Sequence, residues 1–209
     1  IISVNTMHSF DKPFATLGEQ ARLQSCIDTL AQAPEGQDDL WLFGYGSLLW
    51  DAPFPHRAAV AARLVGWRRA MCVWTALARG TPEVPGLSLG LMPGGSCQGM
   101  AFQIGAADRD EALPMIWRRE MWTDVYVPTW IGMEINGIET PALTFVSNKA
   151  SRQYAGDLRQ EYIVEHIALA CGERGSCRDY LANTVLKLRD LGMADCYLEK
   201  LNDAVSQHR

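Results

Sequence analysis

The segment Gly44–Trp50, with the sequence G-Y-G-S-L-L-W, combines a flexible backbone with a hydroxyl group directly after an apolar run. Gly44 and Gly46 allow a sharp turn and a close approach to a ligand, because no Cβ blocks the way. Successive N–H groups in such a turn form a concavity that binds an anion, and Ser47 adds a hydroxyl. The third glycine of a dinucleotide-binding motif is missing and no good helix follows, so the pattern disfavours a nucleotide. An ordinary strand-to-loop turn is the alternative interpretation.

Glu120 is the second candidate, because it lies near the end of a predicted helix between Trp117 and Trp122. The negative end of the helix dipole and the apolar neighbours both favour the neutral acid and raise the pKa of the carboxyl group. A raised pKa suits a residue that accepts and donates a proton near neutral pH. The alternative is a surface carboxylate that pairs with Arg118 or Arg119.

Ser88 lies in the segment Gly86–Gly90, whose sequence G-L-S-L-G matches the G-x-S-x-G motif of serine hydrolases. That motif requires a strand before the serine and a helix after it. In this chain the alternation of apolar and small residues is typical of a strand throughout, and a Pro-Gly-Gly turn follows at Pro93. We therefore predict that Ser88 is a strand residue and not a nucleophile.

The charge distribution excludes two classes of partner. The 209 residues carry 24 acidic and 19 basic side chains and a net charge of −5, and the basic residues are scattered. A nucleic-acid-binding surface would instead be basic and clustered. No stretch approaches the roughly 18 consecutive apolar residues that a membrane-spanning helix needs.

The cysteines and histidines show no metal-binding or disulfide pattern. The six cysteines are widely and irregularly spaced without a C-x-x-C pair, and the four histidines form no H-x-x-x-H pair. Because metal sites usually show clustered ligands, we expect no metal. The pattern is typical of a cytoplasmic enzyme with reduced thiols.

The predicted elements place short strands in the middle of the chain and helices late, which indicates an α+β fold with a small, largely antiparallel sheet or barrel. An extended arm is expected over residues 1–14 and the helices over 16–33, 108–122, 158–170, 178–190 and 194–206. The strands are expected over residues 40–45, 63–74, 86–92, 98–104, 125–135 and 141–147, with turns at Pro93–Ser96 and Asn136-Gly137. We divide the chain into an N-terminal arm and helix, residues 1–38, and a main domain with C-terminal helices, residues 39–209.

Taken in order, several segments resemble the ChaC family of γ-glutamylcyclotransferases over roughly residues 40–190. The most specific of them is the Y-G-S-L-x-W turn that begins at Tyr45. The matching segments are Phe43–Trp50, Gly66–Arg69, Pro85-Gly86, Gly99–Phe102, Arg119-Glu120 with Tyr126, Tyr154–Gly156 and Arg178–Leu181.

The resemblance implies a small mixed β-barrel flanked by helices and the cleavage of glutathione to 5-oxoproline and cysteinylglycine without a cofactor or metal. The partner that it implies is a small molecule, not a nucleic acid or a membrane. It also implies a catalytic role for Glu120, a pocket tyrosine at Tyr154 and a member of an Arg-Arg pair at Arg69. The loop that holds the γ-glutamyl group corresponds to Tyr45, Gly46, Ser47 and Leu48.

The implied reaction needs few protein groups. The α-amino nitrogen of the substrate attacks its own γ-carbonyl, and well-oriented intramolecular reactions reach effective molarities of about 10⁵–10⁸ M. Glu120 then acts as base and afterwards as acid. Donors of the turn at Tyr45–Leu48 either fix the α-carboxylate or receive the developing oxyanion, and the sequence leaves both roles open.

Two alternatives to glutathione cleavage follow from the same residues. One is the same ring closure on other γ-glutamyl amines or peptides. The other is a noncatalytic γ-glutamyl-binding module, which the intact Glu120 disfavours. The sequence does not determine the oligomeric state.

Overall fold

The computed structural model describes residues 8–36 and 38–208, which fall into two compact units. The barrel unit contains residues 15–36, 38–70 and 90–151, and the helical unit contains residues 8–14, 71–89 and 152–208. Residues 1–7 of the predicted arm lie outside the described residues. Since no observation tests the predicted boundary at residue 38, it stays a prediction.

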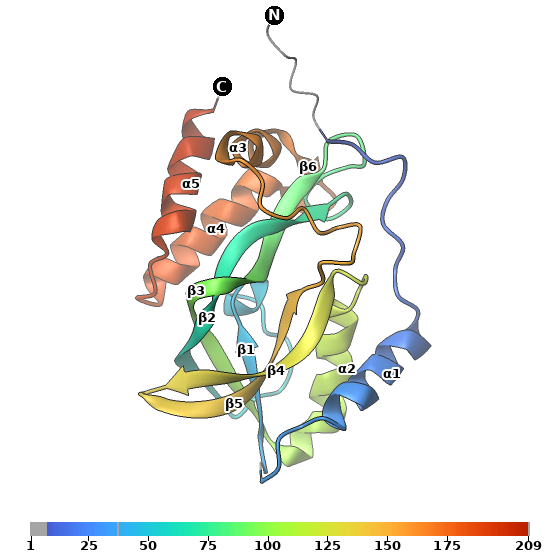
Figure 1. Cartoon of the computed structure of the whole chain (residues 1–209), viewed down its shortest axis with the longest axis vertical. Coiled ribbons are helices and arrows are strands. Elements are labelled where there is room, and N and C mark those ends of the chain that lie inside the picture. The colour runs from blue at the N-terminus through green and yellow to red at the C-terminus, as the bar shows by residue number, and fades with distance from the viewer. Residues whose placement is uncertain (1–7, 37, 209) are drawn as a thin grey trace, which may run out of the picture. The chain divides into compact units, whose positions relative to one another are not determined.

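Five of the described strands form a closed barrel in the order β1-β3-β2-β4-β5, and two of them, β2 and β3, continue into residues of the helical unit (Figure 1). β1 pairs with β3 in antiparallel register, from Leu40 opposite Ile104 to Gly44 opposite Met100, and it pairs with β5 in parallel at Leu42 and Leu143. The mixed, largely antiparallel barrel expected from the sequence is therefore confirmed. Its strands are β1 (Leu40–Gly44), β2 (Ala58–Thr75), β3 (Gly86–Ile104), β4 (Tyr126–Ile135) and β5 (Ile138–Ser147).

The predicted turn between β4 and β5 is confirmed. Asn136 and Gly137 have φ angles of 51° and 81°, and two consecutive positive φ angles are the requirement of the tight hairpin turn that Asn-Gly favours. The two strands pair along their whole length, from Tyr126 opposite Ser147 to Ile135 opposite Ile138.

The turn predicted at Pro93–Ser96 is wrong, because β3 runs through it as one strand. Gly94 and Gly95 have φ angles of 98° and 75° and lie in an exposed stretch of β3. Glycines in this conformation also mark places where a strand bends without reversing. Because β3 is hydrogen-bonded to both β1 and β2 in the barrel, its two halves continue as one strand instead of pairing with each other.

Helix α2 (Arg109–Glu120) carries the candidate carboxyl group in its last turn. It begins at Arg109 although Pro114 lies inside it, and its apolar side is buried at Ile116 and Trp117. The helix ends two residues earlier than predicted, because the backbone of Met121, with φ −103° and ψ 35°, leaves the helical conformation.

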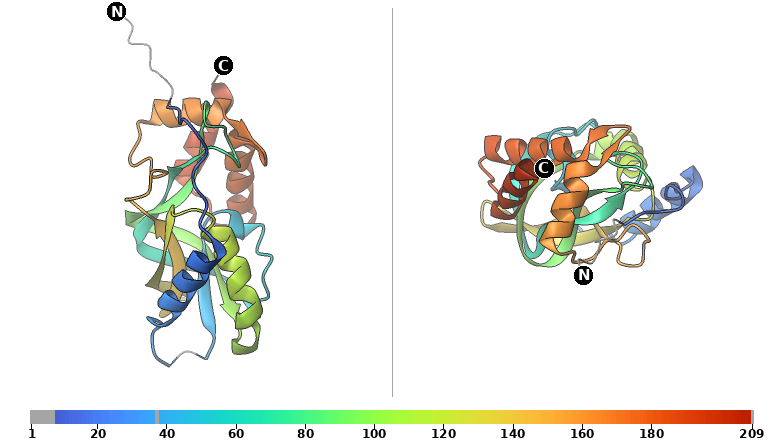
Figure 2. Two further views of the ribbon diagram at one scale, coloured as in Figure 1. Left: turned by 90° about the vertical axis from the view of Figure 1, so that its right-hand side faces the viewer. Right: turned by 90° about the horizontal axis from the view of Figure 1, so that it is seen from above.

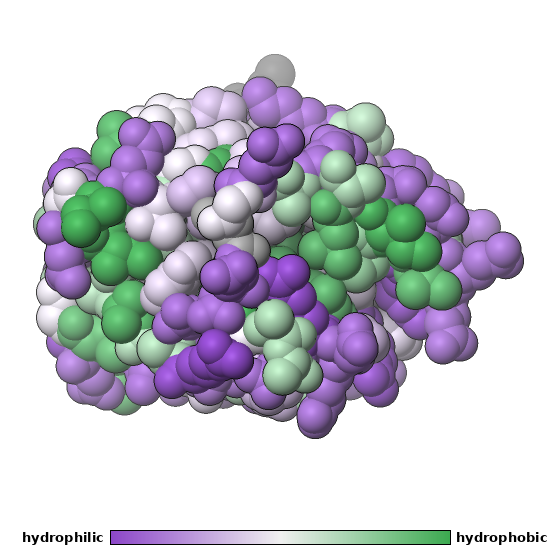
Figure 3. Space-filling model, turned by 90° about the horizontal axis from the view of Figure 1, so that it is seen from below, coloured by the Kyte–Doolittle hydropathy of each residue, from purple (hydrophilic) through white to green (hydrophobic). Residues whose placement is uncertain are grey.

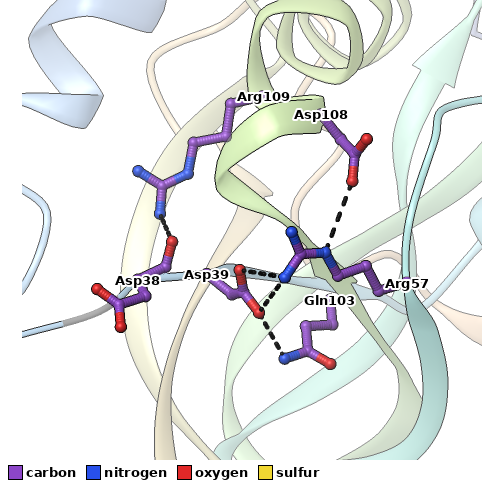
Figure 4. A network of polar contacts seen from close by, with 6 residues as sticks. All are labelled: Asp38, Asp39, Arg57, Gln103, Asp108 and Arg109. Carbon is purple, nitrogen blue, oxygen red and sulfur yellow. Dashed lines mark hydrogen bonds and ion pairs between the residues drawn. The ribbon is translucent and has the colours of Figure 1, made fainter.

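A polar network holds the N-terminal end of α2 to the strands (Figure 4). Arg57 contacts Asp39 at 3.2 Å and Asp108 at 3.8 Å, and Gln103 donates to the same Asp39 carboxylate at 2.8 Å. Arg109 donates to Asp38 O at 2.9 Å. These contacts join the start of β1, the end of β3 and the start of α2.

Helix α1 (Glu19–Leu30) lies beside α2 (Figure 2). Two indole N–H groups define how it docks: Trp117 donates to Ser25 Oγ at 3.2 Å, and Trp130 donates to Thr29 O at 2.8 Å. A buried indole N–H needs an acceptor, and this helix supplies both.

The docked face of α1 does not carry all of its large apolar side chains. The buried side chains are Cys26 and Thr29, whereas Leu23 and Ile27 are 59% and 52% exposed. The predicted helix is confirmed, but the hydrogen bonds from the two indoles select the face that carries Ser25 and Thr29.

Figure 3 shows apolar residues in separate patches among hydrophilic ones on one face of the molecule.

One cluster of buried side chains joins the barrel to α1 and α2. It includes residues from β1, β3, β5 and both helices. Its members are Cys26, Leu40, Leu42, Leu48, Phe54, Phe102, Ile104, Ala112, Leu113, Ile116, Trp117, Met121, Leu143 and Phe145.

The helical unit contains three helices that pack against one another: α3 (Gln160–Leu169), α4 (Cys177–Asp190) and α5 (Cys196–Gln207). Ser176 and Asp195 cap α4 and α5 by accepting backbone N–H groups. The short strands β6 (Cys171–Gly172) and β7 (Gly175–Ser176) form a hairpin that the sequence did not predict. None of the helices in residues 8–36 and 38–208 is long and apolar enough to cross a membrane.

The described part of the N-terminal arm packs on an aromatic cluster of the helical unit. His8 stacks on Trp74 with ring centroids 4.8 Å apart, and Phe10 N donates to Pro82 O at 2.8 Å. His166 lies fully buried against the same Trp74, and one of its ring nitrogens is 2.8 Å from Pro85 O. These contacts give His166 a packing role.

Gly99→Ala is expected to destabilise the protein by about 1–3 kcal/mol, the usual effect of overpacking. A Cβ at Gly99 would lie 2.4 Å from Gly44 O and 2.6 Å from the Phe43 ring, so the barrel would have to shift where β1 leads into the turn. Urea denaturation measures the effect. Gln98→Ala, at the exposed neighbouring position, is the matched control, and equal stability of the two variants would contradict the prediction.

Candidate active site

The glycine turn leaves β1 and forms a single 3-10 turn, η1 (Ser47–Leu49). Leu49 N donates to Gly46 O at 2.9 Å, which closes the turn. A Cβ at Gly44 would lie 2.9 Å from Leu48 Cβ and 3.0 Å from the Phe102 ring. The first glycine is therefore required because the chain folds back closely on itself.

Side chains from the surrounding strands support this turn. Tyr45 directs its hydroxyl group away from the turn and donates to Phe145 O at 2.7 Å. Arg69 donates through Nε to Tyr45 O at 2.7 Å and also donates to Gln98 O. Arg69 is only 5% exposed, so it is the inward-facing member of the Arg68-Arg69 pair. These contacts hold the turn in place, while binding of substrate by Tyr45 and Arg69 stays a prediction.

Glu120 ends α2 with its side chain 15% exposed. Burial raises the pKa of its carboxyl group to about 7, while the charge and the hydrogen bond of Arg119 act in the opposite direction. The raised pKa predicted from the sequence is confirmed, with burial as its main cause. Trp122 contributes less apolar cover than expected, because it is 49% exposed, whereas Trp117 is 2% exposed.

Arg119 connects Glu120 to the glycine turn. Its Nε lies 3.3 Å from Glu120 Oε1, and one terminal nitrogen donates to Ser47 Oγ at 2.9 Å. The other terminal nitrogen lies 2.6 Å from Asp51 Oδ2. The two candidates from the sequence, the turn and the carboxyl group, therefore meet at one guanidinium group.

The structure places Tyr154 in the helical unit, where it forms an isolated antiparallel bridge with Val73 of β2. The next residue, Ala155, donates its N–H to Cys72 O at 2.8 Å. The role of Tyr154 beside the substrate stays a prediction.

Arg119 and Asp51 are the residues that the sequence did not single out as part of the site. The sequence indicated Arg119 as an alternative surface ion-pair partner and as part of the matching Arg119-Glu120 segment, without a role of its own, yet its side chain is 21% exposed and binds the turn as well. Its position next to Glu120 was the available signal. No local pattern relates Asp51 to residue 119, because the contact depends on how α2 packs beside the turn.

No group of three or more His, Cys, Asp or Glu side chains in the described residues is arranged to hold a metal ion. The polar groups brought together at the turn are instead a carboxyl group, a guanidinium group and a hydroxyl group. This set can transfer a proton and hold an anion.

Comparisons with known proteins agree on one family. The model of the family described as ChaC-like protein matches residues 40–208. A glutathione-specific γ-glutamylcyclotransferase of Escherichia coli K12 is 35% identical over 185 residues, which cover 88% of this chain and 78% of that protein. A protein of the same name from Schizosaccharomyces pombe is 31% identical over 180 residues, covering 76% of this chain and 86% of its own length.

The fold is shared with a solved structure. The crystal structure of a yeast γ-glutamyl cyclotransferase specific to glutathione superposes with a TM-score of 0.73 at 18% sequence identity. The match covers 83% of this chain and 98% of the yeast chain. At this identity the likeness concerns the fold alone.

Glu120→Gln is expected to become more stable relative to the wild type as the pH rises from about 5 to 8. The pKa of Glu120 is raised to about 7 from an ordinary value of 4.5, so between these values the folded protein keeps a proton that the unfolded chain has lost. The free energy of unfolding of the wild type therefore falls as the pH rises through this range, by up to about 3 kcal/mol, and glutamine does not titrate.

Urea denaturation of both proteins at pH 5 and pH 8 measures this difference. Glu111→Gln, which removes an exposed carboxylate from the first turn of the same helix, is the control for loss of a charge. A stability difference between wild type and Glu120→Gln that stays constant with pH would contradict the raised pKa.

Proposed function

Because the chain belongs to the ChaC-like family, we propose that it is a γ-glutamylcyclotransferase that cleaves glutathione to 5-oxoproline and cysteinylglycine. The observation that carries the proposal is the meeting of Glu120 and Ser47 at the guanidinium group of Arg119. It joins a proton-transferring group to a turn that can hold an anion. The curated relatives that carry this activity in their names support the choice of substrate.

Glu120 moves the protons of this reaction. Its carboxylate accepts a proton from the substrate's α-ammonium group, and the resulting amine attacks the γ-carbonyl to close the five-membered lactam. As the bond from the γ-carbon to the cysteine nitrogen breaks, Glu120 returns its proton to this leaving nitrogen. The second proton, which the ring nitrogen loses when the lactam forms, also passes to the released amine, which leaves as an ammonium group. A carboxyl group with a pKa of about 7 is present in both forms at neutral pH, as a base that later becomes an acid requires.

The turn holds an anionic oxygen of the γ-glutamyl group. The hydrogen bonds inside the turn are donated by Leu49, Trp50 and Asp51 to carbonyl oxygens of Gly46 and Ser47. The N–H groups of the preceding residues, Gly46 to Leu48, and the Ser47 hydroxyl are the donors that we assign to the substrate. Fixed donors of this kind stabilise a carboxylate or a developing oxyanion without reorganisation during the reaction.

The same chemistry accounts for the absence of a cofactor from the proposed reaction. The substrate supplies the nucleophile, and Glu120 supplies the proton transfer, so no metal or organic group has a step to perform. We propose a cytoplasmic location, which agrees with the reduced state of the six cysteines, all of which lie within the described residues, and with glutathione as an intracellular small-molecule substrate.

Glu120→Gln is expected to lower the rate of 5-oxoproline release from glutathione by about 10²–10⁴-fold, the usual contribution of a general acid and base. Glutamine keeps the size of the side chain but does not accept a proton. The measurement is 5-oxoproline formation by wild type and variant, with glutathione and with free γ-glutamyl dipeptides. If the variant releases 5-oxoproline at the wild-type rate, Glu120 is excluded as the proton carrier. If the wild-type protein releases 5-oxoproline from the dipeptides but not from glutathione, the substrate must be reassigned.

Ser88→Ala is expected to retain wild-type activity. Ser88 lies within β3 between the buried Leu87 and Leu89, and its hydroxyl is 3.5 Å from Val73 O, so it has the place of a strand residue. The same 5-oxoproline assay on a variant with an unchanged circular dichroism spectrum measures this. Loss of activity in the folded variant would support the serine-hydrolase interpretation instead.

A further inference from the structure

The guanidinium group of Arg119 presents each of its three nitrogens to a different residue. Nε faces Glu120 Oε1 at 3.3 Å, and the two terminal nitrogens face Ser47 Oγ at 2.9 Å and Asp51 Oδ2 at 2.6 Å. Glu120 belongs to α2, Ser47 begins η1, and Asp51 follows the turn. One planar group thus joins the two parts of the site that the proposed reaction requires.

We propose that Arg119 is a positioning residue that fixes the Ser47 turn at a set distance from the Glu120 carboxyl group and orients both toward the substrate. This inference rests on the proposed function. It adds a role for Arg119 and Asp51 that the family resemblance does not supply, because their contacts emerge only from the folded chain.

The geometry of the contacts requires an arginine. A guanidinium group is planar and offers its donors in fixed directions, whereas a lysine offers a single nitrogen on a flexible stem. A lysine at position 119 would keep the positive charge, but its three donors sit on one nitrogen and lack the fixed, separated directions of a guanidinium group. Replacing Arg119 by lysine therefore tests the effect of the fixed geometry while the positive charge is kept.

The contact with Ser47 also directs the serine hydroxyl. A hydroxyl group has one donor hydrogen and two lone pairs, and one lone pair of Ser47 Oγ accepts from Arg119. The hydroxyl hydrogen remains available to a substrate oxygen, and its direction is limited by the bond to Arg119. Ser47 is then a donor to the anion that the turn holds.

Asp51 keeps the guanidinium group in place. Its carboxylate is 58% exposed but makes the shortest of the three contacts, at 2.6 Å. Because it lies at the exposed side of the site, Asp51 can be changed with little expected effect on the fold. This makes Asp51→Asn a second route to the same test.

The charge of Arg119 also acts on the proton equilibrium of Glu120. Both favourable influences on the ionised form of Glu120, a charge and a hydrogen bond, come from Arg119, and burial opposes them. Without Arg119 the carboxyl group would keep its proton to a higher pH, by about one unit or more for the loss of an opposite charge at this distance. A role in holding the fold alone would not move this equilibrium.

The test compares Arg119→Gln, Arg119→Lys and Asp51→Asn with the wild type. The matched control is Arg118→Gln, because Arg118 is an exposed arginine in the same helical turn. For Arg119→Gln we expect kcat for 5-oxoproline release to fall at least tenfold and the acid limb of the pH–kcat profile to move up by about one unit. Arg119→Lys should restore the position of the acid limb but not kcat, and Asp51→Asn should lower kcat several-fold. Arg118→Gln should leave both unchanged.

A double-mutant cycle provides a readout that does not depend on activity. Urea denaturation across pH 4–9 is measured with and without Glu120→Gln, in the wild type and in the Arg119→Gln background. We expect the pH at which the stability difference changes to be about one unit higher when Arg119 is absent. If Arg119→Gln does not fold, Arg119→Lys and Asp51→Asn take its place. The positioning role is then tested by their kcat values and by their pH–kcat profiles.

The outcomes separate the two proposals. An inactive wild type whose denaturation cycle shows the shift would overturn the proposed function and leave only the coupling between Arg119 and Glu120. An active wild type, together with an Arg119→Gln variant that keeps its kcat, its pH profile and its denaturation midpoints, would overturn the positioning role alone.

Discussion

The burial of the Glu120 carboxyl group beside a single guanidinium group is the constraint on which the candidate site depends. Removal from water favours the protonated acid, and the neighbouring Arg119 favours the carboxylate, with a resulting pKa of about 7. Burial alone would move the balance further toward the acid, and Arg119 alone would move it toward the carboxylate. The fold must therefore hold Glu120 mostly out of water and keep Arg119 within 3.3 Å of it.

Much of the barrel unit serves this placement by fixing α2 at both ends. At its start, Arg57 and Arg109 bind the Asp38-Asp39 segment at the beginning of β1. At its end, Trp117 binds Ser25 of α1, and Leu17 donates its N–H to Trp122 O. Helix α1 thus stabilises the end of α2 that carries Glu120, which gives the N-terminal segment a structural role.

The sequence predicted those parts of the fold and site that depend on local chemistry. The Asn136-Gly137 turn follows from the φ angles that these residues tolerate, and the raised pKa of Glu120 follows from a carboxyl group among apolar neighbours at a helix end. The barrel class was predicted through the family resemblance and the strand pattern together. The sequence predicts the candidate carboxyl group and the candidate turn separately, and the fold brings them together at Arg119.

The failures share one physical cause, which is that long-range contacts override local signals. Pro93–Ser96 looks like a reversal, but pairing with strands on both sides keeps β3 continuous. In α1, Leu23 and Ile27 stay exposed although they are apolar, because two indole N–H groups require acceptors on another face.

The substrate's own amine explains why none of the chain's potential nucleophiles needs to be activated. Burial raises the pKa of the thiols of Cys26 and Cys177 to about 11, and Cys177 is further engaged with the backbone of Leu87, to whose carbonyl it donates at 3.0 Å. A thiol with such a pKa is protonated at neutral pH and is a poor nucleophile. The protein can therefore use these residues for packing, and what the reaction demands of it is a fixed geometry around Glu120. That demand is met by the three-way contact of Arg119, because a guanidinium group with all three nitrogens engaged can neither rotate nor withdraw without breaking contacts to both halves of the site.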